Sequence, residues 1–590
     1  MRAVALKLMS LKTRMASVGS TSMRAILSWL LAGTLIVWNG FDGAPVRAQQ
    51  TRELQHLWEI DPPLNIAWEI EPSFPKPQID LNGLDSPFAE DRVRVTRELC
   101  HFYERLDLVN REAARKKLIE TLKRGEENLS IRRAMLTATA LMGDASDAQL
   151  LWDFAKDDPV ALGVVERALV KWKSSVAIEV WRQRLQNASD YSPDLLLALE
   201  GIAVVGSEAD AAALETILVD NRLSSACKFQ AARALGAVDP KGQNELAQRV
   251  LNSNADQRHL LAAYILSRHS GETTVRQLKE IIENGSASAQ VIAYQALATV
   301  NPADALAVAP VAISSSDNTL RTLGVEVLQR HANSENLQLQ ATLLADRNPK
   351  IRQLVTKNLL ERAGLGDRET VDEIVAQYLS SEDWQGVEQA IMLAVKLQDP
   401  SYCVMILELL DHPRSEVHMR AGWALMELAE NSSVLAKMQL HAEKMTRKLA
   451  ESLPVSETEI LCLSYLLEAF GKNLYQPAND LLLTYVPKDF FKLGIVSRAS
   501  AIWALGKLNR DADNARLRKS LHDRIQDESP LLPEDLLVRF TSILACGEMR
   551  QVDTLEIVEP FNTGSRDPLA QAGGWATDRI RKNAGERPTN

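Results

Sequence analysis

Residues 346–359 read DRNPKIRQLVTKNL, and the leucine that closes this stretch belongs to a ladder with a fixed spacing. The ladder leucines follow one another at intervals of 31 residues: Leu235, Leu266, Leu297, Leu328 and Leu359. A period in this range is the signature of stacked structural units, none of which can bury its apolar face alone. The sequence therefore predicts a repeat protein and not a single compact core.

The residues around each leucine form the apolar stripe of a helix. Apolar or small residues recur one, four and five positions before it, and around Leu328 these are Val327, Gly324 and Leu323. This spacing places them on one face of an α-helix together with the leucine. The small residue four positions before the leucine lets a neighbouring helix approach closely, so that equivalent helices can stack in layers.

Asx-Pro dipeptides mark the breaks between helices. They are Asp239-Pro240, Asn301-Pro302, Asn348-Pro349 and Asp399-Pro400. Proline disfavours helical geometry in the residue before it, so each dipeptide suits a turn. Each period is predicted to be helix, turn, helix and turn, with two helices of about 10–13 residues. The pattern continues less regularly on both sides, and its spacing loosens after Leu425.

Two segments resemble the HEAT family. Residues 346–359 and 419–425 are similar to the pattern Asp-x-x-Pro-x-Val-Arg-x-x-Ala-x-x-x-Leu, although the second lacks the proline at that spacing. The short period resembles HEAT-like repeats of the phycobilisome-lyase type. Armadillo-like repeats are the nearest alternative, and TPR units have a period of 34. The resemblance implies an exported bacterial protein with an all-α fold, a right-handed α-solenoid of about a dozen HEAT-like helical hairpins over residues 92–560.

Residues 1–48 have the features of a secretory signal peptide. Five basic residues precede an apolar run over residues 25–38, and Val46 and Ala48 stand where a signal peptidase requires small residues. A start at Met23 would shorten this signal and keep its parts. We expect a periplasmic or extracellular protein without stable membrane insertion once the signal is removed. An uncleaved anchor is the alternative.

The segments on either side of the predicted solenoid differ from it. Residues 49–91 are rich in proline, which predicts an extended segment, and they repeat Trp-Glu-Ile-Asp/Glu-Pro at Trp58 and Trp68. Each tryptophan is either an anchor for a partner or a cover for the first repeat, because terminal repeats need capping. Residues 561–590 are mostly polar, and we expect a frayed C-terminal tail.

Charge and motifs exclude several functions. The formal net charge is −10, and residues 1–48 hold six basic residues and one acidic residue, so the exported chain would be more acidic still. An acidic chain lacks the basic footprint of non-specific nucleic-acid binding. The five cysteines form no C-x-x-C pair, and buried core thiols are expected. No nucleophile elbow, zinc-protease motif, P-loop or dinucleotide fingerprint occurs, so we predict no catalytic residues, cofactor or metal.

The polar residues seven positions before each ladder leucine are the predicted binding residues. They are Lys228, His259, Gln290, Arg321 and Arg352. One interpretation is a basic stripe on the concave face that accepts an acidic partner. The other is that the arginines, including Arg420 and Arg498, are structural ties between repeats. The family resemblance implies that Arg352 pairs with Asp346.

These observations favour a non-catalytic scaffold, exported and holding a protein or peptide partner on the concave surface of the solenoid. Two alternatives stay open. One is a lyase-type or chaperone-type enzyme subunit, as the period resembles that of HEAT-like lyases. The other is an envelope component that self-associates through its repeat ends.

Overall fold

A computed structural model describes residues 79–585, apart from 127, 189–192, 240, 254–256, 452–455, 489–493, 566 and 584. The predicted signal peptide, Trp58, Trp68 and most of the Pro-rich segment lie outside the described residues. The chain divides into two compact units, one of which is Glu71–Val434, while the other includes Leu435–Asn590.

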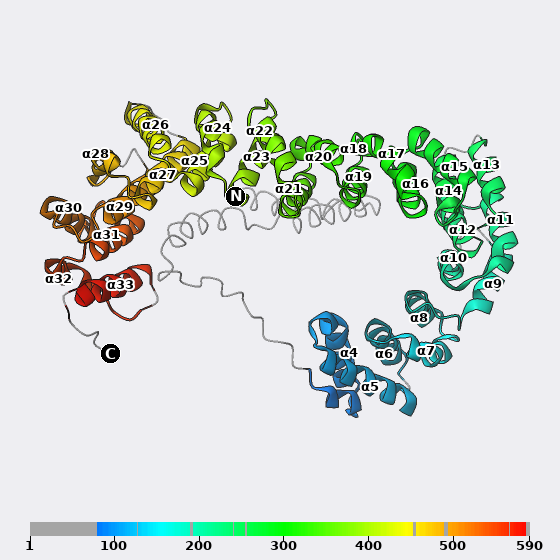
Figure 1. Cartoon of the computed structure of the whole chain (residues 1–590). Helices are drawn as coiled ribbons and strands as arrows, with labels where there is room; N and C mark the ends of the chain where they lie inside the picture. The colour runs from blue at the N-terminus through cyan, green and yellow to red at the C-terminus, as the bar shows by residue number, and fades with distance from the viewer. Residues whose placement is uncertain are drawn as a thin grey trace, which may run out of the picture. The chain divides into compact units, whose positions relative to one another are not determined.

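The first unit consists of helices that alternate between two rows, and no strand occurs among its described residues (Figure 1). The A row contains α4 (Ala89–Phe102), α6 (Leu129–Met142), α8 (Pro159–Lys171), α10 (Pro193–Val205), α12 (Ser225–Val238), α14 (Arg258–Leu266), α16 (Ala287–Val300), α19 (Asn318–Arg330), α21 (Pro349–Gly364), α23 (Trp384–Lys396) and α25 (Ser415–Leu428).

The B row supplies the partner of each A-row helix. It contains α5 (Leu108–Arg124), α7 (Ala148–Ala155), α9 (Ile178–Gln186), α11 (Ala211–Val219), α13 (Asn244–Leu251), α15 (Glu272–Asn284), α17 (Pro302–Ala307), α18 (Ala309–Ile313), α20 (Ser334–Ala341), α22 (Arg368–Leu379) and α24 (Cys403–Glu408). From α6 to α25, each A-row helix packs on the A-row helix before it and on the B-row helix that precedes it in the chain. This arrangement is an all-α solenoid, as the sequence predicted.

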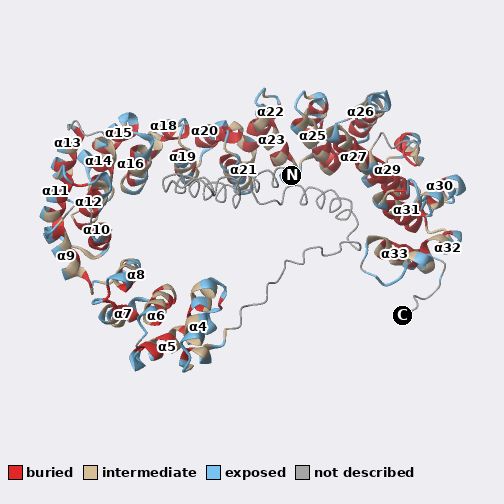
Figure 2. Ribbon diagram, turned by 180° about the vertical axis from the view of Figure 1, so that it is seen from behind, coloured by how far each residue is buried: buried red, intermediate tan, exposed pale blue. Residues whose placement is uncertain are grey.

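The ladder leucines form the core between the rows. All five are 0 % exposed, and Figure 2 shows buried residues along the contacts between neighbouring helices. Two of the Asx-Pro dipeptides lie at breaks between helices, where each caps the helix that follows. The Oδ1 atom of Asn301 accepts a hydrogen bond from the backbone N–H of Asp304 at the start of α17. Asn348 does the same for Lys350 in α21, and in both helices the proline takes the first position, where its missing N–H costs nothing.

The second unit repeats the pattern with tighter helix contacts. Helices α27 (Glu457–Lys472), α29 (Ile495–Leu508), α31 (Leu536–Met549) and α33 (Pro568–Asn583) pack one on the next. The flanking helices are α26 (Ser432–Glu451), α28 (Asn479–Leu483), α30 (Ala515–Ile525) and α32 (Leu555–Val558). A Cβ atom on Gly506 of α29 would stand 2.6 Å from the Cα atom of Ala545 in α31. Glycine is therefore required where these two backbones meet.

The C-terminal segment is helical, contrary to the prediction of a frayed tail. Residues 561–590 were expected to fray, but they contain α33, which packs on α31. Ala572, Ala576 and Ile580 of this helix are fully buried. These small and apolar residues recur every four positions and form one face of the helix, although the segment as a whole is polar. This face packs on α31, where Gly547 lies opposite Ala576. None of the helices in the described part of the chain is long and apolar enough to cross a membrane.

Candidate functional site

Arg321, one of the predicted binding residues, ties two repeats together. Its guanidinium donates to both carboxylate oxygens of Asp346, at 2.6 and 2.9 Å, and to the backbone oxygen of Ser315 at 2.9 Å. A further bond reaches Asn318 Oδ1 at 2.7 Å. The side chain is only 5 % exposed. Arg321 is thus a structural residue that fastens α19 to the start of the next repeat, and a partner has no access to it.

The pairing of Arg352 with Asp346 is wrong in its partner atom. Arg352 Nη1 donates to the backbone oxygen of Asp346 at 2.7 Å, while the carboxylate of Asp346 belongs to Arg321 of the preceding A-row helix. The ion pair between repeats therefore joins Arg321 of α19 to Asp346 in the turn before α21. Arg352, which follows this turn, bonds only to its backbone. The sequence pattern gives the residue types, but it does not show which arginine binds the carboxylate of Asp346 and which binds its backbone oxygen.

The remaining residues of that column do not gather into a surface. Lys228, His259 and Gln290 are half-buried near the starts of α12, α14 and α16. Lys228 Nζ donates to Asn221 Oδ1 at 3.3 Å, and Gln290 Nε2 donates to the backbone oxygen of Ile282 at 2.7 Å. Burial lowers the pKa of His259. Lys228 and Gln290 therefore form hydrogen bonds to residues close to them in the chain.

Helix geometry explains why this column lies close to the packing between helices. Seven residues are nearly two full turns, so a side chain seven positions before a ladder leucine points within about 20° of it. That direction leads into the packing between helices. A residue two positions away is rotated by about 160° to 200°, towards solvent. The exposed columns are consequently those two residues before and two residues after each leucine.

A groove lies across four A-row helices where these two columns run. It has a volume of about 380 Å³ and is lined by Ala203, Val204, Arg233, Ala237, Tyr264, Ser267, Arg268, Ile292, Gln295, Ala296 and Thr299. These residues come from α10, α12, α14 and α16, and from the residues directly after α14. Figure 1 shows these four helices on the inside of the bend that this stretch of the unit makes.

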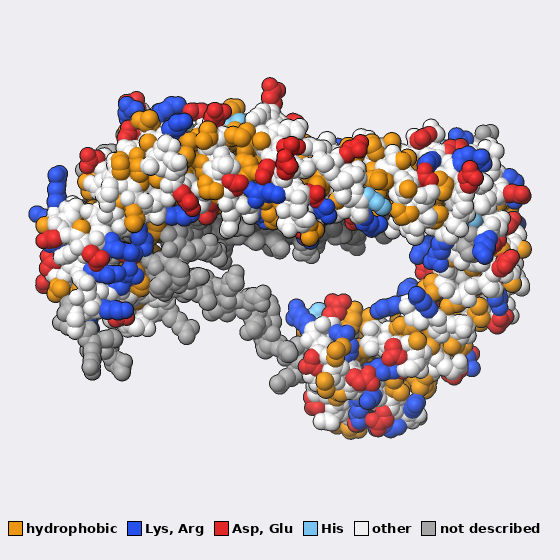
Figure 3. Space-filling model, viewed as in Figure 1, with side chains coloured by type: hydrophobic (Ala, Val, Ile, Leu, Met, Phe, Trp, Pro, Cys, Tyr) orange, Lys and Arg blue, Asp and Glu red, His pale blue; other side chains and the backbone are white. Residues whose placement is uncertain are grey.

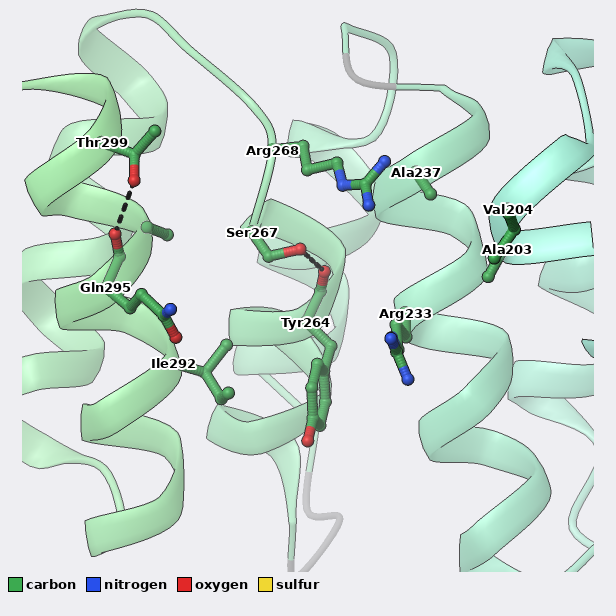
Figure 4. A pocket seen from close by; sticks show the side chains of 11 residues that line it. Ala203, Val204, Arg233, Ala237, Tyr264, Ser267, Arg268, Ile292, Gln295 and Thr299 are labelled. Carbon is green, nitrogen blue, oxygen red and sulfur yellow. Dashed lines mark hydrogen bonds between the residues drawn. The ribbon is translucent and has the colours of Figure 1, made fainter. Parts of the chain in front are cut away.

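The groove has an apolar floor and a basic rim. Figure 4 shows the ring of Tyr264 and the side chain of Arg233 on facing sides of α14 and α12, and Arg268 extending from the end of α14 towards Ala237. The hydroxyl of Ser267 donates to the backbone oxygen of Tyr264 at 2.7 Å, and that of Thr299 donates to the backbone oxygen of Gln295 at 3.0 Å. Neither Arg233 nor Arg268 has a hydrogen bond or ion pair with any described residue. The groove therefore offers apolar area and two unpaired guanidinium groups.

The lining residues include no carboxylate, histidine or cysteine. General acid–base or nucleophilic chemistry needs such a group within hydrogen-bond reach of a substrate. In the described residues, no three side chains of His, Cys, Asp or Glu are placed to hold a metal ion. The chemistry that the groove supports is binding through apolar contact and charge.

The five cysteines are free, and four of them are buried, as expected from their apolar surroundings. Burial raises the pKa of the Cys403 thiol to about 11 and that of Cys546 to about 12. The thiolate is the reactive form of cysteine, so both side chains are inert core residues.

Arg498 in the second unit is also structural, as proposed for this class of arginine. It forms a two-pronged ion pair with Glu534, at 2.9 Å for both contacts, and the two side chains are 3 % and 2 % exposed. Burial would raise the pKa of Glu534, but Arg498 and the other donors hold it below its ordinary value. In the first unit, Arg420 reaches Glu388 of the preceding A-row helix at 3.3 Å.

A second hollow, of about 550 Å³, lies between the B-row helices α11 and α13. Glu208, Glu215 and Asp239 line it together with a single arginine, Arg249. Its charge is opposite to that of the A-row groove. The two faces of this stretch therefore differ in the sign of their exposed charge.

No protein-family model and no curated protein sequence matches the chain. Solved structures with a similar arrangement include importin beta in an ammonium sulfate condition, at 13% identity and a TM-score of 0.41, over 85% of this chain and 72% of that one. Kap95p in complex with RanGDP gives 13% and 0.41, over 85% and 71%. Kap121p bound to Pho4p gives 12% and 0.40, over 85% and 53%. At this identity the likeness concerns the helical fold alone.

Proposed function

We propose that this protein is a non-catalytic scaffold that binds a protein or peptide along the A-row groove of its first unit. The observation that carries the proposal is the groove itself, with an apolar floor and two guanidinium groups that the fold does not use. Arg321 and Arg498, which tie parts of the fold together, are buried and paired. Arg233 and Arg268 are exposed, so the fold gives no reason for their presence at the groove.

The shape of the groove favours a polypeptide over a small metabolite. Small-molecule sites are mostly concave cavities that bury most of their ligand. This groove is an open hollow on a row of parallel helices, and its lining comes from four successive repeats. An elongated ligand can contact several repeats at once, which is how solenoids present extended binding surfaces.

We also propose that the protein acts outside the cytoplasm, since residues 1–48 have the three parts of a signal peptide. The test is N-terminal sequencing of the protein purified from its native source. A mature chain that begins at Gln49 supports export with cleavage. A chain that keeps residues 24–48 contradicts it.

Binding in the groove is tested by site-specific photocrosslinking. A photoreactive amino acid replaces Gln295 in the groove, and in a matched variant it replaces Arg276, which is exposed on B-row helix α15. We expect one partner to crosslink at residue 295 and not at residue 276. The recovered partner is then titrated against Tyr264→Ala, which removes apolar area from the groove. Equal crosslinking at both positions, or unchanged affinity of Tyr264→Ala, contradicts the proposed function.

A further inference from the structure

The charges on the two exposed columns of the A row change character along the first unit. In α19 and α21 each column pair holds opposite charges, Glu326 with Arg330 and Lys357 with Glu361. Both pairs lie 3.9 Å apart, one turn along their own helix. These side chains neutralise each other, so this part of the A row carries no net charge on its exposed columns.

Towards the N-terminus, α8, α12 and the residues after α14 present unpaired cations in the same columns. In α8 they are Arg167 and Lys171, which flank the buried Leu169 as the columns flank a ladder leucine. In α12 the cation is Arg233, and after α14 it is Arg268. All four side chains are exposed, and none forms an ion pair with a described residue. We call these four residues the basic track.

The basic track stands out against the rest of the molecule. The chain as a whole has a formal net charge of −10, and the B-row hollow beside it holds three carboxylates and one arginine. Only Glu200 of α10 brings a negative charge to the exposed columns between α8 and α16. Figure 3 shows basic side chains gathered along the inner side of this stretch. Unpaired like charges on one stretch of surface repel one another, and this repulsion destabilises the folded protein. A bound anion would neutralise the charges and remove the repulsion.

We propose that the groove and the basic track bind an acidic segment of a partner protein in an extended conformation. Its carboxylates pair with Arg233 and Arg268, and the apolar side chains between them rest on Tyr264, Ala237 and Ile292. This inference rests on the proposed function and names the chemistry of the partner. Arginine is suited to this role because its planar group pairs with a carboxylate through two parallel hydrogen bonds.

The spacing of the helices sets the length of the segment. Neighbouring packed helices lie about 8–10 Å apart, so the track spans about 24–30 Å over the three steps from α8 to α14. An extended chain advances about 3.3 Å per residue. A segment of about eight to ten residues covers the track. The alternation of side chains along an extended strand turns every second residue towards the groove, which allows acidic and apolar residues to alternate there.

The apolar floor argues against a nucleic-acid strand as the occupant. Single-stranded nucleic acid is held by aromatic side chains on which successive bases stack. The groove holds one aromatic residue, Tyr264, among alanine, valine and isoleucine side chains. A polypeptide with aliphatic residues between its carboxylates fits this lining, whereas a run of bases does not.

The test measures fluorescence anisotropy with three labelled probes and the full chain without residues 1–48. The first probe is a peptide of about ten residues that alternates glutamate with leucine and serine. The second carries glutamine in place of each glutamate, and the third is oligothymidylate of equal length. We expect the glutamate peptide to bind about tenfold or more tightly than the glutamine peptide, with an affinity that falls as salt rises. Equal binding of the glutamine peptide or of oligothymidylate overturns the inference.

Two double variants locate the site. Arg233→Glu/Arg268→Glu reverses the charge of the groove, and Arg276→Glu/Lys350→Glu makes the same change in net charge at exposed positions on α15 and α21 outside it. We expect the first variant to lose about tenfold or more in affinity for the glutamate peptide and the second to lose none. A thermal melt checks that both remain folded. If the photocrosslinked partner binds Arg233→Glu/Arg268→Glu as it binds the original chain, the acidic-segment inference fails while groove binding stands.

Discussion

Replacement of Arg321 by alanine should destabilise the first unit strongly without any partner present. The guanidinium makes four hydrogen bonds, two of them to Asp346, whose side chain is only 4 % exposed. Arg321→Ala leaves that carboxylate without its counter-charge in a buried position. Removing one member of a buried pair costs about 3–5 kcal/mol, because the other charge stays desolvated and unpaired. We expect a loss of this size in the free energy of unfolding.

Urea denaturation followed by circular dichroism measures this loss, and a matched arginine serves as the control. Arg330 lies 3.9 Å from Glu326, and the two side chains are 63 % and 46 % exposed. An exposed pair contributes at most about 1 kcal/mol, so Arg330→Ala should be nearly neutral. The double variant Arg321→Met/Asp346→Leu should be more stable than Arg321→Ala, because it leaves no unpaired charge. The reasoning is refuted if Arg321→Ala unfolds within about 1 kcal/mol of the original chain.

Three further changes have defined outcomes. Gly506→Ala should lower the free energy of unfolding by about 1–3 kcal/mol, because the new methyl group would press against Ala545. Gly163→Ala in α8, where nothing lies within 4 Å of the added Cβ atom, should raise it by about 0.5–1 kcal/mol. Thermal melts in which Gly506→Ala is the more stable of the two would contradict the packing. Burial lowers the pKa of His269 below its ordinary value of 6.5. As pH falls, the imidazole is therefore protonated in the unfolded chain before it is in the folded one, and the free energy of unfolding should decrease below pH 6.5. A His269→Gln variant with the same pH dependence would contradict this. Arg498→Ala should cost about 1.5–3 kcal/mol, because it removes a buried two-pronged pair while Arg524 still contacts Glu534 at 3.0 Å. A change below about 1 kcal/mol in urea denaturation would show that the pair is dispensable.

The fold follows from the sequence because one period controls it. Every ladder leucine is buried, and Asn301 and Asn348 begin helices as their Asx-Pro position indicates. The fold departs from the prediction at the C-terminus. The stripe of Ala572, Ala576 and Ile580 in α33 is too weakly apolar to stand out in a polar segment. It packs closely because α31 has a glycine, Gly547, opposite Ala576.

The structure offers a second candidate surface that the sequence did not single out, and helix geometry explains the difference. The column seven residues before the leucine is polar and variable, which is also what a binding face looks like in sequence. Two helical turns return it to the packed side, where Arg321 meets Asp346. The signal for the groove was present two residues before and after each leucine, in Arg233, Tyr264 and Arg268. What the sequence cannot supply is which of those cations finds an intramolecular partner, because that depends on side chains of neighbouring helices.

The central claim is that the partner binds on the columns two residues from the ladder leucines and not on the column seven residues before them. Isothermal titration of the crosslinked partner against two double variants tests it most directly. Arg233→Glu/Arg268→Glu changes the groove, and Lys228→Glu/Gln290→Glu changes the other column. We predict that the first variant loses about tenfold or more in affinity and the second keeps it. Retained affinity in the first variant, with loss in the second, would contradict the account.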